Sequence, residues 1–343
     1  MSETSPHSIF ARYYEVDPFV DRFGTDHERA VDVIIPIIHA NEFWRANLVS
    51  IYREVPVNRL ILGDGGCIDG SIDTARQFPR VEVLDHRGFT SLGYSIRHLI
   101  EAVRTEWFIY LHSDVYLPPG WFDAMFKHRG EYDWFECDQH ITVLAEYPLD
   151  LPNVERPFSG SQMGRKVVFR NVTPIIDDDY LYRNEDIILA GLVKRAGFRY
   201  GKVSDTFHFH QVMSKASRWR RTIKRVDVHL DLAPEEEIRA NETFARGIIK
   251  YLSPSEMTPE VLEAVKAAIR RLVQLEVAGY YEFREWAQNT NPTWVPYLDS
   301  TMSIVRRARI ADQIISISHI YRNHGFWGVV KRAIRRIARR AAN

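Results

Sequence analysis

The 343-residue sequence has little cysteine, no long apolar run and no net charge. Its two cysteines, Cys67 and Cys137, are too few for a disulfide framework and suit a reducing compartment. No apolar run approaches the roughly 18–20 residues that cross a bilayer, and the polar stretch after Met1 lacks a signal-peptide core. These absences exclude a disulfide-rich secreted domain and a helical membrane protein, so a cytoplasmic protein is expected.

The zero net charge conceals two parts of opposite sign. Residues 301–343 contain ten Lys and Arg and one Asp, which gives this end +9 and the remainder −9. With 45% hydrophobic residues, the chain can bury a large core, and its length favours more than one domain. We expect an acidic body with a basic tail.

Short apolar runs alternate with helix-like stretches between Val31 and about Tyr200. This alternation predicts an α/β fold with a mostly parallel central sheet. The apolar runs are Val31–Ile35, Leu60–Leu62, Val81–Leu84 and Trp107–Leu111, and the helical stretches lie near Glu42–Arg53, Ser71–Gln77 and Leu92–Val103.

Later parts of the chain give a weaker pattern. Trp134–Leu144 and Lys166–Arg170 are predicted strands, Leu149–Gly164 is a predicted loop rich in Pro, Gly and Ser, and Glu185–Gly197 is a predicted helix. After about Lys215 helix-forming residues dominate. The expected division is an N-terminal extension at 1–30, an α/β domain at 31–214, a helical region at 215–325 and a basic amphipathic helix at 326–343.

One carboxylate follows the most apolar of these strands. The run Trp107–Leu111 leads through His112 and Ser113 to Asp114, and a Pro-Pro-Gly turn comes soon after. Ligands of parallel α/β sheets collect beyond the carboxyl ends of the strands. Asp114 is therefore a candidate metal ligand, and the alternative is an Asp that only caps a turn.

A second carboxylate ends the run Leu60–Leu62, in the sequence Asp64-Gly65-Gly66. A carboxylate there can accept a hydrogen bond from a base or a ribose, and the glycines let a ligand approach the backbone. The alternative is a simple strand-to-helix turn, with Asp69 capping the next helix.

Two further groups carry possible chemistry. Glu185 and Asp186 open a predicted helix, where acidic residues also occur simply as complements of the helix dipole. In Thr206–Gln211, alternation puts His208 and His210 on one face of a strand. The alternative for this pair is a partly exposed edge strand.

Taken together, these pieces resemble glycosyltransferase family 2, the nucleotide-sugar enzymes of GT-A fold. The strand Val31–Pro36 is similar to the first strand of the family, and the run Asp64–Ser71 to its nucleotide loop, although Gly63 stands where an Asp is common. Asp114 matches the last Asp of the Asp-x-Asp motif, with His112 in place of the first. The resemblance covers roughly residues 31–212.

The resemblance implies a role for each of these residues, with a nucleoside-diphosphate sugar as donor and a glycan or lipid-linked acceptor. Asp186 would be the general base of an inverting displacement, aided by Glu185. Asp114, with His210, would hold Mn²⁺ or Mg²⁺; His208 is the weaker candidate. The implied donor-binding residues are Pro36, Asp64, Gly65, Ser113 and Asp114. Assembly of a surface glycan or glycolipid is the expected setting.

Two alternative functions remain open from the sequence. A nucleotidyltransferase of related fold would want a basic, glycine-rich loop after the first strand, which Pro36–Trp44 lacks. A non-catalytic scaffold with a degenerate transferase domain would fit His112 and the unusual pair Ile37-Ile38. His39 follows this pair and is a candidate for the place beside the base; the alternative is a solvated loop histidine.

The tail at 326–343 has its own pattern. Apolar residues beginning with Phe326 and Trp327 recur at helical spacing, and six Lys and Arg fill the other side. A basic amphipathic helix with aromatic residues at its start is typical of a membrane-surface anchor. Packing on the acidic body is the alternative, and no nucleic-acid partner is expected. The predicted location is cytoplasmic, peripheral on the inner face of the cell membrane.

Overall fold

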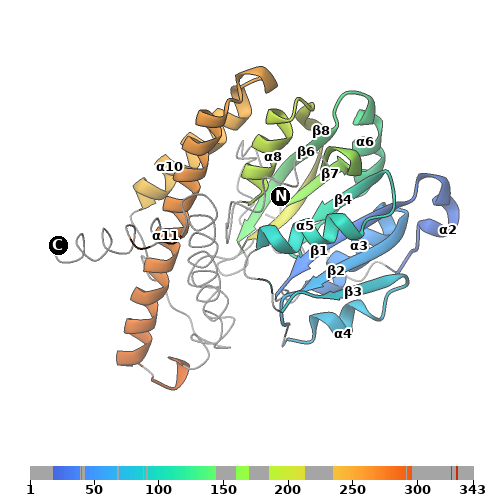
Figure 1. Ribbon diagram of the computed structural model, residues 1–343. Coiled ribbons are helices and arrows are strands. Elements are labelled where there is room, and N and C mark those ends of the chain that lie inside the picture. Colours follow the sequence, from blue (N-terminus) through green and yellow to red (C-terminus); the bar gives the residue numbers. More distant parts are fainter. Residues whose placement is uncertain are drawn as a thin grey trace, which may run out of the picture.

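A computed structural model describes residues 18–38, 40, 43–67, 69–87, 89, 92–143, 160–169, 185–212, 235–290, 292–295, 326 and 330. Its centre is a sheet with helices on both faces, and two long helices lie beyond one of those faces (Figure 1).

The sheet contains eight strands in the order β3-β2-β1-β4-β7-β6-β8-β5. The first four of these pair in parallel, β7 runs antiparallel to both β4 and β6, β6 and β8 are parallel, and β5 is antiparallel to β8. The strands are β1 (Val31–Ile37), β2 (Val57–Asp64), β3 (Val81–Asp85), β4 (Trp107–Leu111), β5 (Val115–Tyr116), β6 (Trp134–Val143), β7 (Ser161–Arg165) and β8 (Tyr200–Val212).

The helices divide between the two faces of the sheet. One hydrophobic cluster joins α3, α4 and α6 to the sheet, and a second joins α5, α8, α10 and α11 to the opposite face. The helices are α2 (Phe23–Asp26), α3 (Trp44–Glu54), α4 (Ser71–Ala75), α5 (Leu92–Ala102), α6 (Trp121–Lys127), α8 (Glu185–Arg195), α10 (Glu235–Tyr251) and α11 (Pro259–Thr290), with short 3₁₀ helices η1 (His27–Arg29), η2 (His128–Gly130), η3 (Pro254–Glu256) and η4 (Pro292–Trp294).

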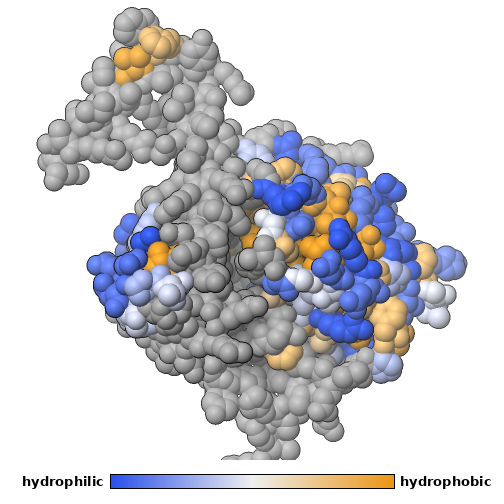
Figure 2. Space-filling view, turned by 90° about the horizontal axis from the view of Figure 1, so that it is seen from below, coloured by the Kyte–Doolittle hydropathy of each residue, from blue (hydrophilic) through white to orange (hydrophobic). Residues whose placement is uncertain are grey.

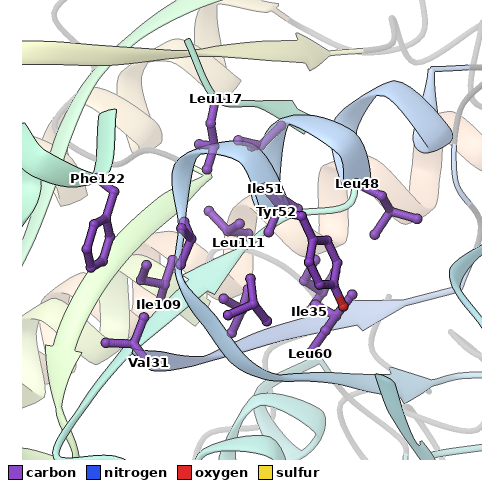
Figure 3. Close-up of a cluster of buried hydrophobic side chains, with 14 of the residues drawn as sticks. Val31, Ile35, Leu48, Ile51, Tyr52, Leu60, Ile109, Leu111, Leu117 and Phe122 are labelled. Carbon is purple, nitrogen blue, oxygen red and sulfur yellow. The ribbon is translucent and has the colours of Figure 1, made fainter. Parts of the chain in front are cut away.

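The apolar runs of the sequence become the buried centre of the sheet. Ile35, Leu60 and Ile109 come from three neighbouring strands and meet Leu48 and Ile51 of α3, all fully buried (Figure 3). Complete burial of one such side chain contributes roughly 1.5–3 kcal/mol. This packing fixes the strands whose carboxyl ends carry the candidate site.

One sequence prediction about strands is wrong. Ser161–Arg165 forms β7, although its first four residues belong to the predicted loop, whereas Lys166–Phe169, placed in a predicted strand, is helical. The polar residues of β7 are buried because they find partners inside the sheet: Gln162 Oε1 accepts a 2.7 Å hydrogen bond from Trp134 Nε1. Gly164 lies flat on the same indole, where a Cβ would come within 2.7 Å of Cε3.

The helical C-terminal part lies beyond α8 (Figure 1). The buried ammonium group of Lys194 on α8 donates to the carbonyl oxygens of Ile249 and Leu252 at the end of α10, at 2.5 and 2.8 Å. α11 begins at Pro259 and packs on both α8 and α10. Within the described ranges, no helix is long and apolar enough to cross a membrane.

Large exposed hydrophobic side chains occur on this helical part, including Phe244 and Tyr251 of α10 and Tyr281 of α11. Viewed from below, the described surface is largely hydrophilic, with apolar side chains gathered near its middle (Figure 2). In the basic tail only Phe326 and Val330 are described, so the predicted membrane helix falls almost wholly outside the described residues.

Candidate active site

The candidate site is built at the edge of the sheet where β1, β2 and β4 end. These strands are parallel neighbours, with Ile37 opposite Asp64 and Ile34 opposite Tyr110. Pro36, Asp64 and the segment after β4 therefore come to the same edge, as expected for a ligand site in an α/β sheet.

Asp64 organises the turn that follows β2. Its Oδ1 accepts hydrogen bonds from the backbone N–H groups of Gly66 and Cys67, at 2.9 and 2.8 Å. Gly66 has φ of +106°, which favours glycine, and the N–H of Gly65 donates to Ile37 O at 2.8 Å. The Asp64 carboxylate is thus held in a fixed orientation at the edge of the sheet.

Asp69 ties this turn to the segment after β1. Its Oδ1 accepts from the N–H and hydroxyl of Ser71 at the start of α4, and its Oδ2 accepts from the N–H of Ala40 at 2.8 Å. Asp69 therefore bonds to the first residue of α4, as the alternative reading of the sequence expected, and Asp64 accepts its own bonds within the turn.

Gly63, where the sequence departs from the expected aspartate, contacts a buried histidine. A Cβ at this position would lie 2.3 Å from Nδ1 of His86. His86 is only 2% exposed, and its ring bonds to Ser95 Oγ at 2.6 Å and to His98 Nδ1 at 2.8 Å. His86 thus fills the space that a side chain at 63 would need.

Three potential metal ligands converge beyond β4. One ligand atom from each of His112, Asp114 and His210 lies within 4.8 Å of the other two. His210 comes from β8, which pairs with β5 so that Val115 faces His210, and its Nε2 is 3.2 Å from Asp114 Oδ1. The His112 and His210 rings lie 5.4 Å apart at a steep angle.

The ligand group is partly exposed and its histidines are oriented by buried neighbours. Asp114 keeps 34% and His210 16% of the side-chain surface exposed. His210 Nδ1 bonds to Gln139 Oε1 at 3.0 Å, which directs Nε2 towards Asp114. His112 Nε2 bonds to the hydroxyl of Tyr110 at 3.0 Å.

Asp114 is an anion in this setting. Burial opposes ionisation, but the neighbouring His210, through its charge and hydrogen bond, and His112 hold the pKa of Asp114 well below its usual range. A carboxylate beside two imidazoles is a donor set suited to a divalent transition metal such as Mn²⁺.

A polar stripe on α3 holds the segment that carries Asp114. Asn47 Nδ2 donates to Ser113 O at 3.0 Å, Ser50 Oγ accepts from the N–H of Leu117 at 3.1 Å, and Glu54 Oε2 accepts from the N–H of Gly120 at 2.7 Å. All three α3 side chains are buried. α3 is thus hydrogen-bonded to the loop at three points between residues 113 and 120.

His208 lies behind the ligand group and does not belong to it. It is fully buried, its Nδ1 bonds to Ser161 Oγ at 2.9 Å, and its ring is 5.7 Å from that of His210. Sulfur of the buried Cys137 lies 3.5 Å from the same nitrogen. This polar cluster supports β8 beneath His210.

Several predicted site residues fall outside the described side chains. Glu185 and Asp186 begin α8, as predicted, but their side chains are not described, nor is any part of His39. Asp64 is the last residue of β2, Asp114 follows the end of β4 by three residues, and His210 lies within β8, two residues before its end. Their roles, like that of the general base, stay predictions.

Sequence reasoning missed Gln139, Tyr110 and the stripe of Asn47, Ser50 and Glu54. Gln139 and Tyr110 gave no signal, because each is one residue in a strand and becomes relevant only through its partner. The stripe had a signal: polar residues spaced by three and four positions on a helix that otherwise buries apolar residues.

Comparison with protein families gives one match. Residues 32–187 fit the family model described as Glycosyl transferase family 2. This range runs from β1 into the start of α8 and includes Asp64 and Asp114 but not His210. No curated protein matches the chain.

Three examples illustrate the solved structures with a related outline. A mannosyltransferase from Pyrobaculum calidifontis, in complex with GDP-Man and Mn²⁺, is 13% identical, with 90% of this chain and 94% of that chain covered and a TM-score of 0.45. Glucosyl-3-phosphoglycerate synthase from Mycobacterium tuberculosis, with Mn²⁺ and UDP-glucose, is 14% identical over 60% and 80% of the chains, with a TM-score of 0.41. S. aureus TarS 1–349 is 12% identical over 73% and 88%, with a TM-score of 0.42. At these scores the likenesses say nothing about substrate.

Proposed function

The chain belongs to glycosyltransferase family 2 and is a glycosyltransferase of α/β, GT-A fold, and from this premise we propose an inverting, metal-dependent transfer of a sugar from a nucleoside diphosphate to a hydroxyl acceptor. The observation that carries the proposal is the convergence of His112, Asp114 and His210 at the sheet edge where Asp64 also ends its strand.

Asp64 and Asp114 are assigned to opposite ends of the donor. Asp64, fixed by its turn, would accept a hydrogen bond from the base or ribose, with Pro36 and Gly65 lining the same edge. Ser113 and Asp114 would lie at the diphosphate end. Because the turn after β2 and the segment after β4 leave the same edge of the sheet, one extended donor could reach both.

A divalent cation fits the residues present. Asp114 and His210 would hold it, and when bound it would offset the negative charge that grows on the departing diphosphate. The bond from His210 Nδ1 to Gln139 supports this assignment, because it leaves Nε2 to face Asp114.

Asp186 is assigned as general base. It would take the proton from the acceptor hydroxyl while that oxygen bonds to the anomeric carbon, and the bond from this carbon to the diphosphate would break on the opposite side. A single displacement of this kind inverts the anomeric configuration. Glu185 would help to hold the acceptor. The position of both residues at the start of α8, a rigid and well-packed helix, supports the assignment.

The donor can be identified by a thermal-shift screen of sugar nucleotides with and without Mn²⁺. A ligand at a hundredfold excess over its Kd stabilises the folded state by about 2.7 kcal/mol. We expect one base to give a shift that depends on the metal. A shift in melting temperature that is the same without Mn²⁺ would contradict the proposed metal dependence. The absence of a shift with every donor would favour a non-catalytic scaffold.

The variant Asp114→Ala tests the site itself. Calorimetry with the identified nucleoside diphosphate and Mn²⁺ should show metal-dependent binding lost, while the melting temperature changes little because Asp114 is partly exposed at the sheet edge. Asp73→Ala on the exposed side of α4 is the control. Unchanged affinity in the Asp114 variant would remove this residue from the site.

The acceptor is proposed to be a glycan or lipid-linked molecule, presented at an anionic membrane surface that the tail at 326–343 would bind. The segregation of six basic residues from the apolar side of the tail supports this. Co-sedimentation with anionic vesicles should be lost when 326–343 are removed, with the melting temperature unchanged. A drop of several degrees without vesicle binding would make the tail a structural element.

A further inference from the structure

We propose that His112 is a third metal ligand, so that this chain holds its cation with two imidazoles and one carboxylate and selects Mn²⁺ over Mg²⁺. The inference rests on the metal site of the proposed function and goes beyond it, because the Asp-x-Asp resemblance assigns no ligand role to a histidine at this position.

The first observation is the position of His112. It lies two residues before Asp114, and potential ligand atoms of His112, Asp114 and His210 fall within 4.8 Å of one another. Its ring lies 5.4 Å from that of His210 and is inclined to it by 70°. An imidazole from β8 and an imidazole from the segment after β4 therefore lie close to each other and to the carboxylate.

The second observation is that the His112 ring is held in place. Its backbone N–H donates to Gly160 O at 2.8 Å, and its Nε2 bonds to the hydroxyl of the buried Tyr110 at 3.0 Å. A Cβ at Gly160 would come within 3.2 Å of both Cγ and Nδ1 of His112. The close approach of Gly160 therefore limits the positions open to the imidazole.

The Tyr110 bond also bears on ligation. An imidazole has two ring nitrogens, so one can bond to a protein group while the other ligates a metal. His210 has the mirror arrangement, with Nδ1 bonded to Gln139 Oε1 and Nε2 facing Asp114. Each histidine thus has one nitrogen bonded to a protein group, as metal-ligating histidines generally do.

The donor set determines which cation is favoured. Mg²⁺ prefers oxygen ligands, keeps several waters and is reluctant to lose them. Imidazole nitrogen suits later first-row ions, and affinity for a site of this kind rises from Mn²⁺ to Co²⁺. Replacing a carboxylate by His112 removes one of the oxygen ligands that Mg²⁺ would use and adds a nitrogen.

The test compares metal binding by the full chain with that of His112→Asp and His112→Ala. His112→Asp restores the motif of the family and is expected to fold normally. His27→Ala, on the exposed η1 turn, is the control for loss of a histidine. Free Mn²⁺ is measured by electron paramagnetic resonance, Mg²⁺ by competition, and Co²⁺ by the intensity of its visible absorption bands, without substrate or nucleotide.

Wild type and His27→Ala should bind Mn²⁺ more tightly than Mg²⁺. His112→Ala should bind Mn²⁺ at least about tenfold more weakly, and His112→Asp should narrow the preference for Mn²⁺ and change the Co²⁺ spectrum. Unaltered affinities and spectra in both variants would overturn the inference while leaving Asp114 and His210 as ligands. If Asp114→Ala is also without effect, the metal part of the proposed function fails as well.

Discussion

At the scale of the residue, Gly63 and His86 form a matched pair. Because a Cβ at 63 would lie 2.3 Å from His86 Nδ1, we expect Gly63→Asp to destabilise the fold by about 1–3 kcal/mol or more through overpacking. Urea unfolding checks this. In the double variant with His86→Gly the penalty should shrink markedly, since the space is then open.

The control for Gly63→Asp is a glycine with free space around it. Gly130 meets this condition, because a Cβ there would meet nothing within 4 Å. Gly130→Asp should change stability little. If Gly63→Asp were as stable as Gly130→Asp, the contact with His86 would not be the reason for glycine at 63.

A variant of Asp186 can distinguish donor binding from sugar transfer. The variant Asp186→Asn should keep its affinity for the donor nucleotide but lose turnover by about 10²–10⁴-fold, because a general base acts on the acceptor and not on the diphosphate. Calorimetry and a transfer assay on the same preparation provide the two readings. Near-normal turnover would shift the assignment to Glu185.

At the scale of the element, α3 links the hydrophobic core to the loop that carries Asp114. Removing the Asn47 amide takes away its bond to Ser113 O, so Asn47→Ala should weaken metal-dependent donor binding by about 10–100-fold. It should also cost about 1–2 kcal/mol of stability, because the amide is buried. Calorimetry and urea unfolding measure the two effects.

Arg45→Ala on the exposed side of the same helix is the control and should change neither quantity by much. Loss of stability without loss of affinity in Asn47→Ala would mean that the helix supports the core but does not position the loop.

The sequence predicts an element well when the residues of that element alone determine its structure. β4 coincides with the predicted Trp107–Leu111, because five consecutive apolar residues have no favourable place but the interior. β7 was predicted as a loop, because Ser161, Gln162 and Gly164 look like loop residues until Trp134 and His208 are placed beside them. The strand is stabilised by tertiary partners that no local pattern contains.

The same distinction applies to the site. The positions of Asp64 and Asp114 were predictable because one ends an apolar strand and the other soon follows one, and position near a strand end is a local property. The orienting bonds of Gln139 and the contact of His86 with Gly63 join residues from separate strands, so their significance follows only from the register of the sheet.

At the scale of the whole molecule, His86 makes stability depend on pH. Burial and the neighbouring His98 lower the pKa of His86 to about 4, against an ordinary value of 6.5. Between these values the unfolded chain binds more protons, so the free energy of unfolding should fall as pH drops from about 6.5 to about 4, on the order of 3 kcal/mol. Urea unfolding at several pH values measures the slope.

Two other titrating groups act in different windows. Burial opposes protonation of His128, but its bonds to Asp205 and Glu131 raise its pKa, so its contribution is present below 6.5 and is lost only as pH rises further. Asp133 has a lowered pKa and loses its contribution only below 3.8. In His86→Gln the slope between pH 6.5 and 4 should largely vanish; a slope equal to that of wild type would assign it to another group.

The pairing of β5 with β8 has a consequence for the time course of folding. β5 contains two residues, and its recorded partner is a strand almost a hundred positions further along the chain, where Val115 meets His210. Contacts between such distant segments close slowly, because much of the chain must already be ordered before they form. The ligand group His112, Asp114 and His210 exists only once this pairing is made. The protein would therefore become able to bind a cation only late in folding, and a bound cation would slow the first steps of unfolding.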